Sequence, residues 1–334
     1  MKNQAVIKTK HKYSKKTFLV IYAYLLLLLL IISVAATYTW FSLTRTPQVS
    51  NLSMYVTSRS GLELALTPDS DKWGSQLSYL DMASDSVPLR PITWSEKDKT
   101  FYAAVYGIDG RLSGKWQPLS DERNANRNNY DGYYGLGTFY ARTSQDVTVS
   151  LTHAMQVQEG VSGSGTYLIG TPVWNTEELS HTNAGQGAGN AVRIGIQITD
   201  LADNDRPIKS TERFFIYEPN CDSHADGSVG YVETPSIDGD STLVPSERLI
   251  LQTHSSWTES SPTQNGVQVY TLGEFITPIE LFTLKADQKV MIRLYIWLEG
   301  QDVDCTNAIR EAQIIANMQF NAVPENQSGL QPVR

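Results

Sequence analysis

Apolar residues recur at every second position in short runs throughout residues 50–323. This alternation puts the apolar side chains of each run on one face, as in half-buried β-strands. Gly, Pro, Asn, Asp and Ser bound most of the runs, as expected for turns. The pattern predicts strands within residues 52–56, 62–66, 147–151, 192–198, 214–217, 249–251, 267–272, 292–298 and 312–320.

So many short strands predict an all-β domain over residues 50–323, and we expect a jelly-roll-like antiparallel β-sandwich. The runs 52–56 and 62–66 are predicted to form a hairpin across the turn SRSG. The last two runs are predicted to form a second hairpin, joined by a long polar loop. Two domains divided near residue 185 are the alternative. Residues 324–334 have the composition of a disordered tail.

A run of 19 uncharged residues, FLVIYAYLLLLLLIISVAA, occupies positions 18–36. As a helix it would extend about 28 Å, close to the hydrocarbon thickness of a bilayer. Residues 1–17 carry six lysines and no acid, so the positive-inside rule puts the rest of the chain outside the cytoplasm. The segment is either a retained transmembrane anchor or a signal peptide cleaved after Ala35 or Ala36. Residues 37–49 follow as a linker.

The net charge of −8 becomes −14 when the six N-terminal lysines are left out. An acidic body disfavours nucleic-acid binding, which needs basic patches. We therefore expect the partners to be the membrane, other surface proteins or further copies of the chain.

Cys221 and Cys305 are the only cysteines in the sequence. In an exported domain they allow a single disulfide. Its 84-residue loop would stabilise the fold by roughly 4 kcal/mol on the chain-entropy model. Two unpaired thiols are the alternative.

The stretch EGQDVDC follows an apolar strand and places Glu299, Asp302, Asp304 and Cys305 close together. A metal or catalytic site, a disulfide-pinned loop and an ordinary polar turn are the three interpretations. We favour a structural loop that closes the last hairpin.

Catalytic motifs do not support an enzyme. The sequence contains no HExxH and no GxSxG, and its glycine-rich segments lack the spacing of phosphate-binding loops. With this many acids a carboxylate pair for glycoside hydrolysis stays open, but no particular pair stands out. We expect a non-enzymatic protein without a required cofactor.

The segment DSHADGSVGYVE, residues 222–233, has the spacing of a calcium loop. The candidate metal ligands are Asp222, Asp226, Ser228 and Glu233. However, His224 offers nitrogen where calcium prefers oxygen, and the flanks are not helical. An acidic, solvated turn is the alternative.

Aromatic residues gather near the Asn- and Gly-rich segment RNANRNNYDGYYGLG. Their faces suit stacking on sugar rings, which makes Trp116, Tyr130, Tyr133 and Tyr134 candidate ligand-binding residues. A loop packed on its own sheet is the alternative.

The segment VAATYTWFSLTRTPQVSNLSMYVTS, residues 34–58, resembles the processing region of exported bacterial TasA/camelysin-type proteins with a SipW-type signal peptide. YIWLEGQDVDCTN followed by AQIIANMQFNA is similar to the C-terminal end of exported clostridial proteins with such N-termini. The resemblance implies a jelly-roll subunit of a surface or biofilm-matrix fibre. In that role TYTWFSLTRT would add as a strand to the sheet edge of a neighbouring copy. A membrane-tethered carbohydrate- or ligand-binding module is the alternative function.

Overall fold

The computed structural model describes the helix 15–43 and most of the strands and turns that follow. The described ranges are 15–43, 51–82, 89–95, 99–106, 112–119, 133–152, 157–158, 165–170, 174–175, 180–181, 188–218, 250–252, 263–264, 267–270, 280–302, 304–306, 309 and 312–324. The structural statements below concern these residues. The chain divides into two compact units, Met1–Arg45 and Thr46–Arg334.

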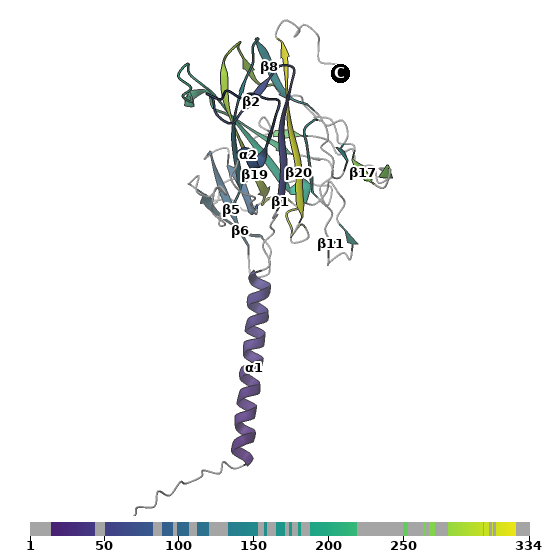
Figure 1. Ribbon diagram of the computed structural model, residues 1–334. Helices are drawn as coiled ribbons and strands as arrows, with labels where there is room; N and C mark the ends of the chain where they lie inside the picture. The colour runs from purple at the N-terminus through teal and green to yellow at the C-terminus, as the bar shows by residue number, and fades with distance from the viewer. Residues whose placement is uncertain are drawn as a thin grey trace, which may run out of the picture. The chain divides into compact units, whose positions relative to one another are not determined.

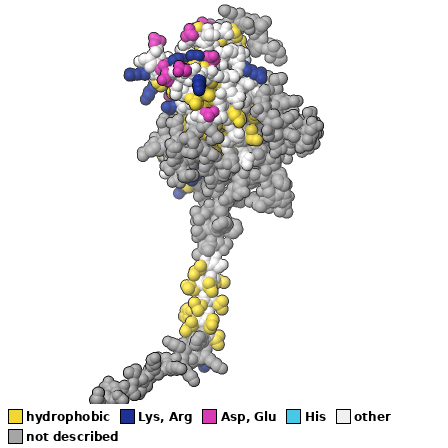
Figure 2. Space-filling view, viewed as in Figure 1, with side chains coloured by type: hydrophobic (Ala, Val, Ile, Leu, Met, Phe, Trp, Pro, Cys, Tyr) yellow, Lys and Arg dark blue, Asp and Glu magenta, His cyan; other side chains and the backbone are white. Residues whose placement is uncertain are grey.

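The first unit contains one helix, α1 (Lys15–Leu43). Its side chains from Leu19 to Val34 are exposed, and Figure 2 shows apolar side chains along the helix. α1 ends at Leu43, so it includes the start of the segment predicted as a linker. Across the described residues, no helix combines the length and the apolarity needed to span a membrane.

The second unit contains two large mixed sheets. The first sheet has the strand order β18 (Glu280–Leu284), β8 (Val147–Leu151), β20 (Gln313–Pro324), β1 (Asn51–Arg59) and β3 (Gln76–Ser78). A further strand, β10 (Tyr167–Gly170), pairs with β20.

The second sheet has the order β15 (Ile250–Gln252), β14 (Arg213–Glu218), β13 (Val192–Asp200), β19 (Lys289–Glu299), β4 (Pro91–Ser95), β5 (Thr100–Tyr106) and β6 (Leu112–Leu119). β7 (Gly135–Arg142) also pairs with β19, and β2 (Glu63–Ala65) pairs with β7.

Smaller elements complete the described chain. A three-stranded sheet contains β16 (Thr263–Gln264), β17 (Val267–Tyr270) and β9 (Val157–Gln158). β11 (Trp174–Asn175) pairs with β12 (Ser180–His181). The short helices are α2 (Tyr79–Met82), α3 (Ala188–Ala191) and the 3₁₀ turn η2 (Lys209–Thr211).

The main core lies between the two large sheets, whose apolar faces supply it alternately along each strand. From the first sheet come residues such as Val149, Ile314 and Phe320, and from the second come Ile194, Ile196 and Leu294. All of these side chains are fully buried. The all-β prediction is therefore confirmed, and the predicted strand at 292–298 lies within β19.

Both predicted hairpins are wrong. β1 belongs to the first sheet and β2 to the second, because the chain turns through Ser60 and Gly61, with φ of 59° and 80°, and changes sheets. β19 and β20 also lie in different sheets. The acidic loop between β19 and β20 therefore crosses from one sheet to the other.

The prediction of an antiparallel sandwich holds for most of the described strand pairs but not for all of them. β1 and β20 lie side by side and run parallel (Figure 1). In their register Asn51 lies opposite Gln313 and Arg59 opposite Asn321. Two further pairs, β19–β4 and β14–β15, are parallel. A short hairpin turn imposes antiparallel pairing on the two strands that it joins, and none of these parallel pairs is joined by a short turn.

Candidate ligand-binding pocket

The second sheet is apolar on both of its faces. Along β19, Ile292, Leu294 and Ile296 enter the main core, so Tyr295 and Trp297 point to the outer face. A second buried cluster forms there, with Ile92, Trp94, Phe101, Ala103, Leu119, Tyr134, Leu136, Phe214, Ile216, Tyr295 and Trp297. A sheet face is usually solvated on one side in antiparallel sandwiches, so this second apolar face needs a cover.

The strands β4, β5 and β6 provide part of that cover. Trp94 on β4 stacks on Phe214 of β14, with ring centroids 4.3 Å apart and an interplanar angle of 21°. β4 and β14 are separated in the sheet order by β13 and β19, so this ring contact spans two intervening strands on the outer face.

Five aromatic rings form a closed series of contacts on this outer face. The centroid distances are 5.0 Å for Trp94–Phe101, 4.9 Å for Phe101–Tyr134, 5.8 Å for Tyr134–Tyr295, 5.7 Å for Phe214–Tyr295 and 4.3 Å for Trp94–Phe214. Each of the five residues is only 4–8 % exposed. Ring contacts of this geometry stabilise a fold beyond the area that they bury. The series therefore forms a packed aromatic wall.

Gly195 on β13 makes room for this wall. A Cβ atom at this position would lie 2.6 Å from Cζ of Phe214 and 3.1 Å from Cζ3 of Trp297. No real side chain tolerates the first distance, so Phe214 packs where it does because residue 195 is glycine.

A pocket of about 410 Å³ opens beside the aromatic wall. It is lined by Trp94, Lys99, Thr100, Phe101, Leu119, Tyr134, Gln197, Lys209, Glu212, Phe214 and Tyr295. Its volume lies in the range of sites for small molecules, which combine apolar walls with a few polar groups.

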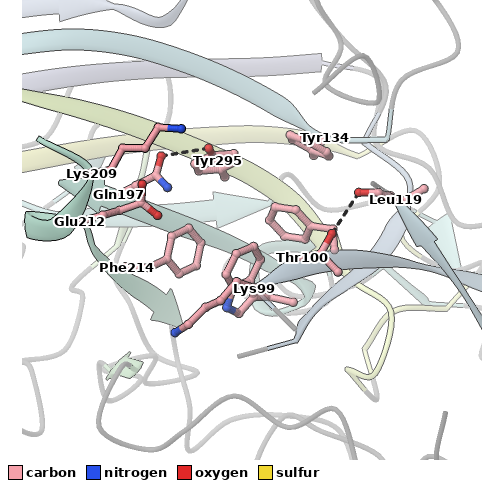
Figure 3. A pocket seen from close by; sticks show the side chains of 11 residues that line it. Lys99, Thr100, Leu119, Tyr134, Gln197, Lys209, Glu212, Phe214 and Tyr295 are labelled. Atoms are coloured by element: carbon pink, nitrogen blue, oxygen red, sulfur yellow. Dashed lines mark hydrogen bonds between the residues drawn. The ribbon is translucent and has the colours of Figure 1, made fainter. Parts of the chain in front are cut away.

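The polar groups of the pocket come from different elements (Figure 3). The hydroxyl of Tyr295 donates a hydrogen bond to Oε1 of Gln197 over 3.1 Å, which orients the amide. Lys209 and Glu212, from η2 and the residue after it, are exposed on the same side as Gln197. Thr100 lies on the other side, where its hydroxyl donates to the carbonyl of Leu119 over 3.1 Å. The pocket therefore offers an amide, an ammonium and a carboxylate beside aromatic rings.

A buried ionic network occupies the end of the same outer face. Arg193 on β13 pairs through Nη2 with Glu218 of β14 at 2.9 Å and with Asp302 at 2.6 Å, and all three side chains are fully buried. Arg193 also donates to the carbonyls of Asn190 and Val192. Charge-assisted bonds of this kind offset the cost of removing the charges from water.

Glu299 joins the aromatic wall to this network. Its carboxylate accepts hydrogen bonds from Nε1 of Trp297 at 3.1 Å and from the backbone N–H of Gln301 at 3.1 Å. Trp297 in turn contacts Phe101 of the wall, with centroids 5.1 Å apart. Burial raises the pKa of Glu299 to about 7, while Arg193 and these hydrogen bonds act in the opposite direction. Its protonation therefore changes near neutral pH.

The acidic loop after β19 is thus a buried structural loop rather than a solvated turn. Asp302 binds Arg193, and its Oδ1 accepts from the backbone N–H of Asp304 at 2.8 Å. Asp304 accepts a hydrogen bond from Asn190 at 3.0 Å. Each acid of the loop therefore has a bonding partner within the protein.

The predicted disulfide is not supported. Cys305 is 8 % exposed and packs in the main core, while Cys221 lies outside the described residues. The described part of the chain contains no disulfide, so the 221–305 pairing stays a prediction.

The four predicted ligand-binding residues have different outcomes. Tyr134 lines the pocket, and Tyr133 packs against the same cluster with the guanidinium of Arg90 5.5 Å from its ring centroid. Trp116 faces away, because Leu119 points into the cluster and a residue three positions earlier on a strand points to the opposite face. Tyr130 lies outside the described residues.

The predicted calcium ligands Asp222, Asp226, Ser228 and Glu233 all lie outside the described residues. Among the residues that are described, no group of three or more His, Cys, Asp or Glu side chains is arranged to hold a metal ion.

Sequence reasoning missed Trp94, Phe101, Phe214 and Tyr295 as pocket residues. One signal was present, since Tyr295 and Trp297 alternate with the core residues of β19 and so place large aromatic groups on the face expected to be solvated. An apolar non-core face indicates a second packing surface.

Comparison with known proteins does not identify the chain: no family model, curated protein or solved structure matches it.

Proposed function

We propose that this chain is a non-enzymatic binding module of the cell surface, and that the aromatic pocket on the outer face of the second sheet binds a carbohydrate. The observation that carries the proposal is the combination of aromatic rings with the Gln197 amide, Lys209 and Glu212 in one pocket of about 410 Å³. The rings offer apolar surface, and the polar groups offer both donors and an acceptor.

Carbohydrates have this pair of properties. The C–H groups of a sugar ring form an apolar face that packs on aromatic rings, and its hydroxyls need donors and acceptors around the edge. Tyr295 holds the Gln197 amide in a defined orientation. Such preorganisation lowers the entropic cost of binding.

The surface location rests on the sequence. The uncharged run 18–36 behind a lysine-rich tail supports export, with the leader either retained or cleaved. The finer fold is part of the same proposal: two sheets packed face to face, with neighbouring strands from distant parts of the chain, support a jelly-roll-like sandwich.

The test is binding of the purified full-length chain to a carbohydrate array, in a polyoxyethylene detergent that carries no sugar. We expect binding that Tyr134→Ala reduces and that Trp116→Ala, on the opposite face of β6, leaves intact. Equal losses from both variants, or binding to none of the sugars, would contradict the proposal. Release of reducing ends from a bound glycan would contradict its non-enzymatic part.

A structural role in a surface or matrix fibre is the second candidate, and one observation favours it. On the side away from β20, β1 pairs only through Tyr55–Thr57 with β3, so Asn51–Met54 have no strand partner there among the described residues. Other edges carry features that oppose strand addition, such as Pro118 on β6 and the register shift between Glu280 and Phe282 on β18. β1 is therefore the edge that we expect a neighbour to use.

Deletion of residues 37–46 tests this second role. If that segment adds to the β1 edge of a neighbouring copy, its loss shortens or abolishes filaments seen by electron microscopy at high protein concentration. Filaments of unchanged length would exclude strand addition by this segment.

A further inference from the structure

The described charged residues that line the pocket have a net charge opposite in sign to that of the chain. Residues 18–334 carry −14 overall, whereas the charged residues that line the pocket are Lys99, Lys209 and Glu212. The described lining therefore has one more positive than negative charge. A local reversal of sign in an acidic protein favours an anionic ligand over the cations that the rest of the surface attracts.

Lys209 is the cation best placed to bind that anion. It is exposed on η2, and Figure 3 shows it on the side of the pocket that holds Gln197 and Glu212. Two other described lysines on the same domain are held in ion pairs, Lys285 with Asp146 at 3.0 Å and Lys289 with Asp205 at 3.0 Å. Lys209 forms no salt bridge with any residue that the structure describes, Glu212 included.

Lys99 approaches the pocket from a different element. It occupies the tight turn before β5 with φ of 52°, next to Thr100, and its side chain is exposed. Figure 3 shows Lys99 near Phe214, across that ring from the group formed by Gln197, Lys209 and Glu212. Two ammonium groups from separate elements therefore flank one aromatic surface.

We infer that the ligand is an acidic saccharide, a sugar whose ring packs against the aromatic wall while its carboxylate binds Lys209, with Lys99 adding positive charge at the mouth. This inference rests on the proposed carbohydrate-binding function and names its ligand class. Glu212 accepts hydrogen bonds from ring hydroxyls and, as a like charge, weakens binding of multiply charged anions such as sulfated sugars.

The experiment compares each acidic oligosaccharide with its own carboxyl-reduced form, in which the carboxylate has become a hydroxymethyl group. Suitable probes are oligomers of galacturonic acid, oligomers of mannuronic acid and hyaluronan fragments. Affinities for the full-length chain are measured by calorimetry at low and at high salt. We expect at least one acid to bind on the order of fivefold more tightly than its reduced form, with the difference shrinking as salt screens the exposed charges.

Matched variants locate the effect. Lys209→Gln should lower the affinity for the acid towards that for the reduced form and leave the affinity for the reduced form unchanged. Lys285→Gln makes the same change of charge outside the pocket lining and should alter neither affinity.

The two proposals fail in different ways. Equal binding of acid and reduced forms would overturn the acidic ligand class. An acid preference that survives Lys209→Gln would overturn the assignment of the carboxylate to Lys209. Either result would leave the carbohydrate pocket standing. An absence of binding to every acid and every reduced form would overturn both proposals. A preference for sulfated over carboxylated sugars would overturn the role given to Glu212.

Discussion

Glu299 is a single carboxyl group whose surroundings set a pH dependence for the whole domain. Burial beside Trp297 and Gln301 raises its pKa from 4.5 to about 7. Below pH 4.5 the folded and unfolded chains both hold the proton. Between pH 4.5 and about 7 the folded chain keeps a proton that the unfolded chain releases. The contribution of this proton to the free energy of unfolding is therefore present at low pH and is lost as the pH rises through about 7.

We therefore expect Glu299→Gln to remove this part of the pH dependence. In the parent chain the folding constant should fall by up to about tenfold per pH unit across the window, in addition to the effects of other groups. Urea unfolding at about pH 5 and about pH 8 measures it, with Glu280→Gln at an exposed position of β18 as the control. An unchanged difference between the two pH values in the Glu299 variant would contradict the assignment.

Asp302 is a second single side chain with a large expected effect on stability, because it completes a buried ion pair with Arg193. Asp302→Ala removes one of the two carboxylates that pair with Arg193 in a fully buried site, and we expect a loss of about 3–5 kcal/mol. Asp200→Ala is the control, since it breaks the half-exposed pair with Arg213 at 2.9 Å and should cost about 1 kcal/mol or less. Chemical denaturation compares the two, and equal losses would mean that burial does not govern the pair.

At the scale of elements, the pocket depends on how β13, β14 and β19 pack their outer faces. Gly195 lies opposite Tyr295 on β19 and opposite Ile216 on β14, below the ring of Phe214. The aromatic wall therefore requires the absence of a side chain at Gly195 on β13 as much as it requires the aromatic groups around it.

Gly195→Ala should displace Phe214 from Trp94 and weaken ligand binding more than its small size suggests. A Cβ at 2.6 Å from the ring forces a shift, and overpacking of this kind typically costs about 1–3 kcal/mol. Near-ultraviolet circular dichroism reports the ring displacement and the binding assay its consequence. Gly74→Ala, where nothing lies within 4 Å of the new Cβ, should change neither signal.

At the scale of the whole molecule, the two ends of the second unit meet. β1 opens the described part of this unit, β20 closes it, and the two strands pair along nine residues in the middle of the first sheet. β20 also pairs with β8 and β10, both antiparallel, so it has three strand partners in the first sheet. The domain therefore cannot complete its first sheet until nearly all of the chain is present.

Truncation tests this closure. A chain that ends at residue 312 lacks β20 and the buried residues Ile314, Met318 and Phe320, and we expect it not to fold. A chain that ends at residue 324 loses only the segment predicted as a tail and should keep its melting temperature within about 2 °C. Thermal melts of both chains decide the matter, and a cooperative transition in the shorter chain would contradict the central role of β20.

Local pattern was sufficient for the strands that it predicted and for the all-β class, because a half-buried strand needs period-two alternation wherever it lies. It did not predict β4, β5, β6 or β7, of which β4, β5 and β6 supply pocket residues. Tyr134 could be nominated as a ligand-binding residue for a similar reason, since aromatic clustering is visible along the chain. The sequence pattern could not predict which strands pair. The apolar alternation of Leu52–Val56 is the same whether β1 pairs with β2 or with a strand some 260 residues away. The pocket and the Arg193 network each join residues from separate strands, turns and loops. Alternation specifies which residues share a face of a strand. The order of the strands in the two sheets and the crossing of the loop after β19 determine what that face contacts, because both join parts of the chain that are distant in sequence.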